Sequence, residues 1–182
     1  TTGTINGHDY VDLGLPSGLK WATCNVGAFT SEGIGDYYSW GETRTKSEYI
    51  EDNANTYKMN VEDISGNEQY DVARAQWGSP WRLPTKSECE ELVNKCKWEW
   101  ANRGGSNGYL VTGPNGESIF FPASGYTRFS DTYDCDEGYF WCSTPVEEYD
   151  GDYSYSLYFS NKLIDVNWNY RFRGLSVRPV SD

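Results

Sequence analysis

The sequence predicts a single α+β domain that has little helix, many loops and short antiparallel strands. The chain of 182 residues has the length of one ordinary domain. Only one segment, at about residues 85–98, combines a helix-capping motif with a continuous apolar face. The remainder alternates short apolar stretches with turns rich in Gly, Asn and Ser, and shows no repeat and no linker. These observations favour one domain over residues 1–182.

The main helix is predicted from its N-terminus onward. Thr85 and Glu88 have the spacing of a capping box, in which each side chain binds the backbone N–H of the other. Apolar side chains at positions 92, 93 and 96 recur on one helical face. Two glycines at 104–105 are expected to end the helix. A second, short helix is expected near 70–77.

Turn signals predict two hairpins. The first joins strands at 8–15 and 19–26 through a Pro-Ser-Gly turn. The second joins strands at 109–112 and 118–121 through Gly-Pro-Asn-Gly. The last strand is expected at 175–180.

Two further strands in the C-terminal third are predicted from alternation, because successive side chains of a strand point to opposite faces. In the first, Tyr155, Leu157 and Phe159 are expected to point inward, with the intervening Ser156, Tyr158 and Ser160 outward. In the second, the inward set is Ile164, Val166 and Trp168, and the outward set is Asp165, Asn167 and Asn169.

Charge and composition exclude several kinds of partner. The net charge is −12 and the pI about 4.5, so the chain lacks the basic surface that binds nucleic acid and would be repelled by anionic membranes. No stretch approaches the ~20 apolar residues that span a bilayer. No signal peptide is recognisable, so Thr1 is expected to begin a mature or truncated chain. The acidity is expected to serve mainly solubility.

Five cysteines leave the disulfide pattern open; they lie at positions 24, 89, 96, 135 and 142. Cys89 and Cys96 are seven residues apart on the predicted helix, which places them too far apart to bond. Cys135 and Cys142 could close a small loop, and Cys24 could meet Cys96 only through the fold. The odd count leaves at least one free thiol. A disulfide framework and a set of buried unpaired thiols remain equal alternatives.

Catalytic and metal-binding chemistry finds little support. His8 is the only histidine and no Cys-x-x-Cys pair occurs, so neither a zinc site nor a nucleophile–histidine pair is expected. Acidic runs at 131–138 and 147–152 lack the spacing of a calcium loop and are expected to be solvated. Carboxylate pairs such as Glu42 and Glu117 arise by chance among 27 acidic residues. We expect no cofactor and no enzyme, with a carbohydrate-active enzyme as the weakest alternative.

Residues 146–173 carry the composition of a binding surface. They contain five of the 15 tyrosines, one tryptophan, and several Asn and Ser residues. Tyr supplies rigid contact area, while Ser and Asn supply adaptable hydrogen bonds, as in antibody paratopes. The alternative is ordinary strand residues in a chain that is 16% aromatic. The expected ligand contacts are Tyr149, Asp150, Asp152, Tyr153, Tyr158, Asp165, Asn167, Trp168, Asn169, Tyr170, Phe172 and Arg173.

Five phrases in order along the chain carry a resemblance to a known family; they lie at 10–22, 38–43, 81–85, 111–116 and 176–180. Together they resemble the Fibrobacter succinogenes major paralogous domain family. The resemblance implies a C-type-lectin-like fold related to formylglycine-generating enzymes, with paired terminal strands and a ligand face in the C-terminal third. It also implies display at the bacterial cell surface, on lipoproteins or pilus-associated adhesins.

The sequence departs from the enzymatic relatives of that family. Their copper site needs a cysteine pair near the C-terminus, and here no cysteine follows Cys142. Some family members are diversified by retroelements that randomise adenines. Changing the adenines of an Asn codon can give Cys142 and all of the expected contact residues except Trp168, because no such change gives a Trp codon. The expected function is an extracellular, non-catalytic adhesin domain, monomeric within a larger assembly, that binds a protein or glycan. A structural subunit or cap of a surface fibre is the alternative.

Overall fold

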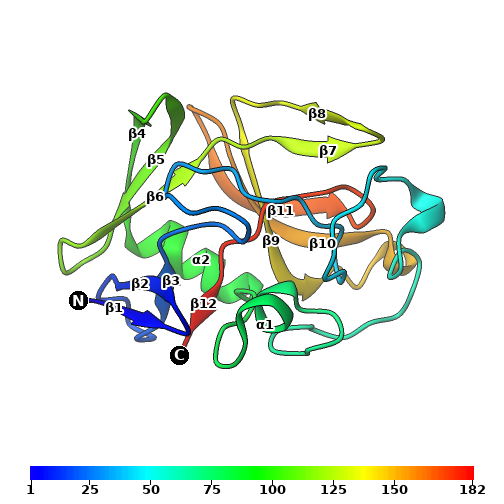
Figure 1. Ribbon diagram of the computed structural model, residues 1–182, viewed down its shortest axis with the longest axis horizontal. Helices are drawn as coiled ribbons and strands as arrows, with labels where there is room; N and C mark the ends of the chain where they lie inside the picture. Colours follow the sequence, from blue (N-terminus) through cyan, green and yellow to red (C-terminus); the bar gives the residue numbers. More distant parts are fainter.

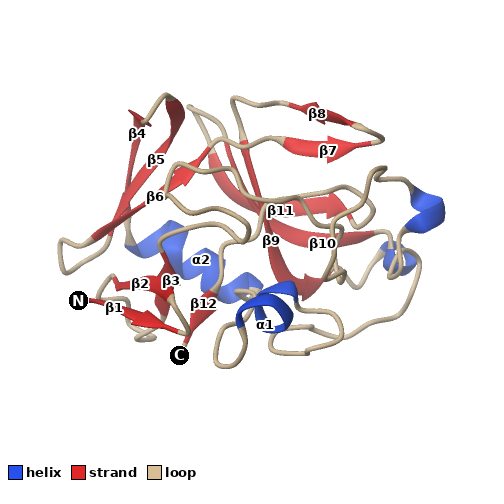
Figure 2. Ribbon diagram, viewed as in Figure 1, coloured by secondary structure: helices blue, strands red, loops and turns tan.

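The computed structural model describes all 182 residues, and its architecture is mostly β. Strands and bridges hold 37% of the residues and helices 12%, arranged as four antiparallel sheets around one main helix (Figure 2). The expected α+β, C-type-lectin-like class is therefore wrong. The loops between predicted elements pair with each other through isolated bridges and short strands, which the local sequence pattern did not reveal. The expected single main helix and the many loops are present.

The first sheet brings the two ends of the chain together, in the order β1-β2-β3-β12. Its strands are β1 (Thr2–Ile5), β2 (His8–Asp12), β3 (Lys20–Ala22) and β12 (Val180–Ser181). Trp21 of β3 is in register with Val11 on one side and Val180 on the other. The predicted N-terminal hairpin and the pairing of the terminal strands are confirmed. The two termini lie close together at one end of the molecule (Figure 1).

The second sheet corrects the predicted end of the main helix. Its strands are β4 (Lys97–Arg103), β5 (Ser106–Thr112) and β6 (Ser118–Pro122), in the order β4-β5-β6. The predicted β5–β6 hairpin is confirmed, with Thr112 opposite Ser118. Gly104 and Gly105 both have positive φ and form the tight β4–β5 turn instead of a helix end. Every second residue of β4, such as Trp98, packs toward the core, which fits a strand.

The remaining strands form a three-stranded sheet and a small ribbon. The sheet has the order β11-β10-β9, with β9 (Gly138–Pro145), β10 (Tyr153–Phe159) and β11 (Ile164–Tyr170). The ribbon pairs β7 (Tyr126–Arg128) with β8 (Asp131–Tyr133). In β10 and β11, cross-strand partners such as Tyr153 and Tyr170 share one face. Because β11 has a neighbour on one side only, its other edge is free.

Both predicted helices are present. The main helix α2 (Lys86–Lys95) begins at Thr85 with the complete capping box to Glu88. The short α1 (Val72–Trp77) is capped by the Asp71 side chain, which accepts from the Arg74 N–H. Two 3-10 turns, η1 (Glu51–Asn53) and η2 (Tyr149–Gly151), complete the set. Neither α-helix is long and apolar enough to span a bilayer.

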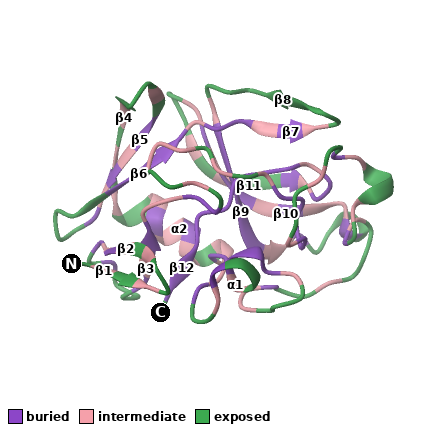
Figure 3. Ribbon diagram, viewed as in Figure 1, coloured by how far each residue is buried: buried purple, intermediate pink, exposed green.

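Two buried clusters form the core, and each combines aliphatic with aromatic side chains. One gathers around α2 and includes Trp21, Leu92 and Phe159. The other includes Trp40, Trp81 and Trp141, all with at most 1% of their surface exposed. The buried residues follow β9, the inner strands and the C-terminal segment through the middle of the molecule (Figure 3). Large aromatic rings thus fill part of the core beside the aliphatic side chains.

The predicted alternation in β10 and β11 is only partly right. Leu157 and Phe159 are buried as expected, and Tyr155 packs against the core. Ser156, predicted to point outward, is buried, because the second face of this sheet is also covered. Near the end of β11 the expected pattern inverts, since Trp168 is 40% exposed while Asn169 is buried. At this end of the sheet the face that carries Asn169 is therefore covered, and Trp168 is exposed on the other face.

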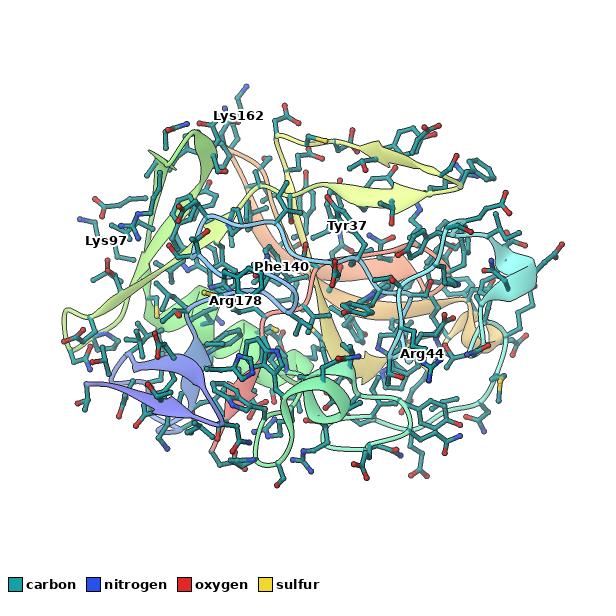
Figure 4. All side chains as sticks on the ribbon, viewed as in Figure 1. Tyr37, Arg44, Lys97, Phe140, Lys162 and Arg178 are labelled. Carbon is teal, nitrogen blue, oxygen red and sulfur yellow. The ribbon has the colours of Figure 1, made fainter.

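The C-terminal segment, residues 171–181, runs through the centre of the molecule. Its backbone bonds to Tyr38 through Leu175, to Thr127 through Gly174, and to Tyr139 and Trp141 through Ser176. Arg178 is fully buried and donates to the Asn25 side chain and to the Ala22 and Phe120 carbonyls at 2.8–3.3 Å. Figure 4 shows Arg178 in the interior, near Phe140.

Replacing Gly174 with alanine is expected to cost about 3 kcal/mol of unfolding free energy. An added Cβ would overlap Thr127 Oγ1 and lie 2.7 Å from the Tyr49 ring, and neither neighbour has room to move within the buried segment. Urea denaturation measures the loss. The control is Gly18→Ala, at a turn with φ of +75° and open space, which is expected to lose about 1–2 kcal/mol from backbone strain alone. Equal losses would contradict the close packing at Gly174.

Candidate functional site

A small cavity lies along the β11-β10-β9 sheet, lined by residues of all three strands. Its volume is about 220 Å³. Seven of the twelve predicted contact residues line it: Tyr153, Tyr158, Asn167, Trp168, Asn169, Tyr170 and Arg173. Tyr139 and Ser156 complete the lining. The structure thus places more than half of the predicted contacts around one concave site.

An aromatic cluster of Tyr149, Tyr153, Trp168 and Tyr170 lies at the mouth of this cavity. The Tyr149 and Trp168 ring centroids are 5.3 Å apart, and those of Tyr153 and Tyr170 are 4.6 Å apart. Tyr153 contacts both Tyr149 and Trp168 at 5.7 Å, so the four rings are continuous. Tyr149 is 59% and Trp168 40% exposed. The domain therefore presents a contiguous aromatic surface to solvent at this point.

The cluster depends on a turn that directs Tyr149 outward. Tyr149 and Asp150 both have positive φ, an uncommon conformation for residues other than glycine. Gly151 follows with φ of +88°, and its backbone lies so close to Met59 that a Cβ would approach the Met59 backbone to 2.6 Å. The Gly151 carbonyl also accepts from the Lys58 N–H. Backbone contact with residues 58–59 thus fixes the turn that carries Tyr149.

Arg171 anchors the same region from beneath. Its Nη1 donates to the Thr56 and Met59 carbonyls at 3.0 and 2.8 Å, and its Nε donates to the Tyr153 carbonyl at 3.1 Å. The guanidinium lies 4.5 Å from the Trp40 ring. Burial lowers the pKa of Arg171 to about 10, so it remains a cation at neutral pH. Arg171 ties the 56–59 loop to the start of β10 and so holds Tyr153 in place.

Arg173 lies within the cavity wall between two aromatic rings. Its guanidinium carbon is 4.7 Å from the Tyr126 ring centroid and 5.1 Å from that of Tyr170. Its Nη1 donates to Asn169 Oδ1 over 3.3 Å. Arg171 and Arg173 therefore differ in role, since the first is buried among backbone carbonyls and the second faces the cavity.

Three tyrosine hydroxyls near the cavity stay protonated well above neutral pH. Burial, followed by a 2.7 Å hydrogen bond to Glu137, raises the pKa of Tyr158 to about 12. Burial also raises the pKa of Tyr139, which donates to the same carboxylate at 2.7 Å. The Tyr170 hydroxyl is the main cause that raises the pKa of Tyr153 to about 12. These phenols are neutral donors under physiological conditions.

Five predicted contacts lie outside the cavity. Tyr149 joins the aromatic cluster, and Asp165 is exposed on β11. Asp150 lines a separate, open and largely polar cavity of about 770 Å³. Asp152 pairs with Lys58 at 3.7 Å. Phe172 is buried against Tyr170, which removes it from the ligand-accessible surface.

Sequence reasoning missed Tyr126 and Tyr139. Tyr139 is in register with Tyr158 across β9 and β10, and its ring lies 5.2 Å from that of Tyr158. Tyr126 contacts Tyr139 at 5.0 Å and supports Arg173. Tyr139 begins a run of three consecutive aromatic residues at 139–141, and that run could have indicated it. No local signal points to Tyr126, because β7 reaches the site only through the fold.

Other reactive groups are distributed away from the cavity. No group of three or more His, Cys, Asp or Glu side chains could hold a metal ion. His8 stacks on Trp77 at 3.7 Å, and burial lowers its pKa. Glu42 is buried and pairs with Lys46 at 3.2 Å.

The five cysteines are all unbonded, so neither suggested pairing, Cys135 with Cys142 nor Cys24 with Cys96, is present. Cys135 is exposed on a loop, whereas Cys142 is buried beneath α2. The nearest neighbour of the Cys142 sulfur is instead the sulfur of Cys89, at 3.1 Å.

Comparison with known proteins places the cavity within a recognisable region. Residues 93–180 match the sequence model of a family described as a domain of unknown function, DUF8237. This stretch contains β9, β10, β11 and most of the C-terminal segment, so the similarity covers all nine residues that line the cavity. No curated protein and no solved structure matches the chain.

Tyr153 and Tyr158 are expected to ionise near pH 12 in the folded protein and near pH 10 in the unfolded chain. Their raised folded pKa stabilises the fold below about pH 10, and this contribution is lost as the pH rises toward 12. Tyrosinate absorbance, followed with pH in the native and denatured protein, measures the difference. The Tyr158→Phe variant should lack one late-ionising group. Superimposable native and denatured titrations would contradict the expectation.

Proposed function

We propose that this chain is a non-catalytic ligand-binding domain displayed at a bacterial cell surface, and that the aromatic cluster and the adjoining cavity contact a protein or glycan ligand. The observation that carries the proposal is the exposure of Tyr149 and Trp168 in a continuous group of four rings. Large apolar side chains that gather on an exposed surface commonly mark an interaction site.

The chemistry of the cluster supports binding. Tyr and Trp offer broad contact area with few rotatable bonds, so little conformational entropy is lost when a ligand binds. Such residues, with Arg, dominate the energetic hot spots of interfaces. Here Arg173 and two asparagines lie next to the rings and add polar groups that can orient a ligand.

The rigidity of the support also favours this function. Tyr153 is held by the Arg171 bond to its carbonyl, and the Tyr149 turn is held by residues 58–59. A preformed surface loses little conformational entropy when it binds a ligand, which raises the affinity for a given contact area. The cluster would therefore act as a prepared platform.

Cell-surface display forms part of this proposal and comes from the sequence resemblance to the Fibrobacter succinogenes major paralogous domain family. The proposed role is that of an adhesin domain within a larger surface assembly. A structural cap of a fibre would use the same rings to pack against another subunit. The two roles differ in whether the isolated domain captures a foreign ligand or associates with itself.

The double variant Tyr149→Ala/Trp168→Ala is expected to weaken ligand capture by about 30-fold or more, because two hot-spot residues are truncated. Ligands are first identified by applying the purified domain to glycan and protein arrays, and affinities are then measured for the strongest one. The unfolding free energy should fall by only about 1–2 kcal/mol, since Tyr149 is 59% and Trp168 40% exposed.

Phe129→Ala is the matched control, because Phe129 is 46% exposed but lies on the turn between β7 and β8, outside the cluster. The Phe129→Ala variant should bind the array ligand with the same affinity as the unsubstituted domain. Equal loss in both variants, or self-association through the cluster without any captured ligand, would contradict the proposal. Loss of capture on adding a calcium chelator would contradict its metal-free character.

A further inference from the structure

Arg173 is a cation without an anionic partner in a chain whose net charge is −12. None of the seven ion pairs includes it. Its Nε is buried and donates to no atom of the chain. A buried charged donor with no acceptor is unfavourable, so such a group is a candidate for a functional role.

Neighbouring amides make the cavity rich in donors. The Oδ1 atoms of Asn167 and Asn169 accept from the backbone N–H groups of Trp168 and Tyr170, at 2.8 and 2.9 Å. With both oxygens engaged, the two Nδ2 groups remain to donate to a ligand. The Arg173 guanidinium, which lines the cavity, and these two amides are hydrogen-bond donors, which suits a ligand group that carries negative charge.

The aromatic lining indicates what carries that charge. Trp168, Tyr153 and Tyr170 are among the residues that line the cavity, and the negative quadrupole of an aromatic ring face favours contact with the polarised C–H groups of a sugar ring. The volume of about 220 Å³ is below the roughly 300–1,000 Å³ of sites for drug-sized ligands. It suits a single ring.

An extended peptide is a poorer fit, because the backbone N–H groups on the unpaired edge of β11 already donate to side chains of the same strand. The backbone N–H groups of Val166, Trp168 and Tyr170 each bind the side-chain oxygen of the preceding residue at 2.8–2.9 Å. A peptide strand recognises a sheet edge through such N–H groups. Their occupation disfavours strand addition beside the cavity.

We propose that the cavity binds an acidic sugar, with the ring against Trp168 and Tyr170 and the carboxylate against Arg173 and the two asparagine amides. This inference rests on the proposed ligand-binding function and names the ligand class. Arg173 is stacked between Tyr126 and Tyr170, so its guanidinium is oriented before the ligand arrives. That arrangement favours a planar carboxylate, which a guanidinium can bind with two hydrogen bonds.

The test compares methyl glucuronide with methyl glucoside, which differ in the carboxylate, by calorimetric titration of the purified domain. The glucuronide is expected to bind at least about ten-fold more tightly, because it adds charge-assisted hydrogen bonds. Arg173→Gln should bring the two affinities together, whereas Trp168→Ala should weaken both. Arg128→Gln is the matched control, since its Nε is likewise buried and unpaired but outside the cavity.

Three results would overturn the inference. These are equal affinities for the two glycosides in the unsubstituted domain, a preference that survives Arg173→Gln, and tighter binding of a glutamate-containing peptide than of the glucuronide. The proposed function would stand in each case if the Tyr149→Ala/Trp168→Ala variant still lost capture of the array ligand. The two proposals therefore fail separately.

A second inference comes independently from two cysteines. Cys89 on α2 and Cys142 on β9 are both buried in the same core cluster, with their sulfur atoms 3.1 Å apart. The two positions are 53 residues apart in the sequence. We infer that they form a disulfide bond when the chain folds in the presence of a disulfide donor.

The reaction is a double thiol–disulfide exchange. One cysteine thiolate attacks a small disulfide such as oxidised glutathione and releases one glutathione thiol. The second cysteine then attacks the mixed disulfide and releases the other, so two electrons and two protons pass to the donor. Burial raises the pKa of Cys89, which makes its thiol unreactive once folded. The bond must therefore form during folding.

Refolding with oxidised glutathione is expected to raise the melting temperature by about 10 °C over the reduced protein. Alkylation after denaturation should label three of the five cysteines, and peptide mapping should join Cys89 to Cys142. Cys135→Ser, at an exposed position, should leave the shift unchanged, whereas Cys142→Ala should abolish it. Labelling of all five cysteines in the oxidised unsubstituted protein, or a different peptide pair, would overturn the inference.

Discussion

Hydrogen bonding by the C-terminal segment is the constraint on which the other parts of the fold depend. Residues 171–181 pair with β3, with the loop at Tyr38, with β7 and with β9. Separate sheets of two to four strands would be marginal on their own. The buried segment bonds through its backbone to three of these sheets and through Arg178 to the Phe120 carbonyl of the β4-β5-β6 sheet, and it contributes residues to both core clusters.

The same segment explains how the site is supported. It leaves β11 at Tyr170 and turns inward at Arg171, so that a cavity-facing arginine and a buried arginine follow one another closely. Arg171 and Arg178 are both taken out of water without a carboxylate partner. Backbone carbonyls and aromatic faces compensate for this desolvation, which makes each arginine specific for one arrangement of loops.

Local patterns predicted what local forces determine. The Thr85–Glu88 capping box, the β5–β6 turn and the two strands of the β10–β11 hairpin involve residues close in sequence, and all are present, although the pairing of those two strands was not predicted. Seven of the predicted contacts come together because that hairpin holds most of them. The end of α2 was mistaken, since packing of Trp98 against the core favours a strand. The predicted fold class was wrong because isolated bridges join distant loops, and such bridges leave no periodic signal in the sequence.

Long-range contacts account for the remaining differences at the site. Tyr126 reaches Arg173 from a strand more than forty residues upstream, and Cys89 meets Cys142 across 53 residues. Phe172 is an aromatic residue of the kind expected to contact a ligand, but it follows the inward turn of the C-terminal segment and is buried. Its position depends on the path of the C-terminal segment, which the residue types alone do not specify.

The occupied edge of β11 has a consequence for proteins that stand close together. An uncovered sheet edge is a template on which a neighbouring molecule can add its own strand, and crowded copies would then polymerise. In this chain Asp165, Asn167 and Asn169 cover that edge with their own side chains. Substitutions at Asn167 or Asn169 would alter the lining of the cavity, and loss of the side-chain acceptor at any of the three positions would remove a barrier to fibre formation. Substitutions that keep this barrier are thus limited to residues whose side chain can accept a hydrogen bond from the backbone N–H of the next residue.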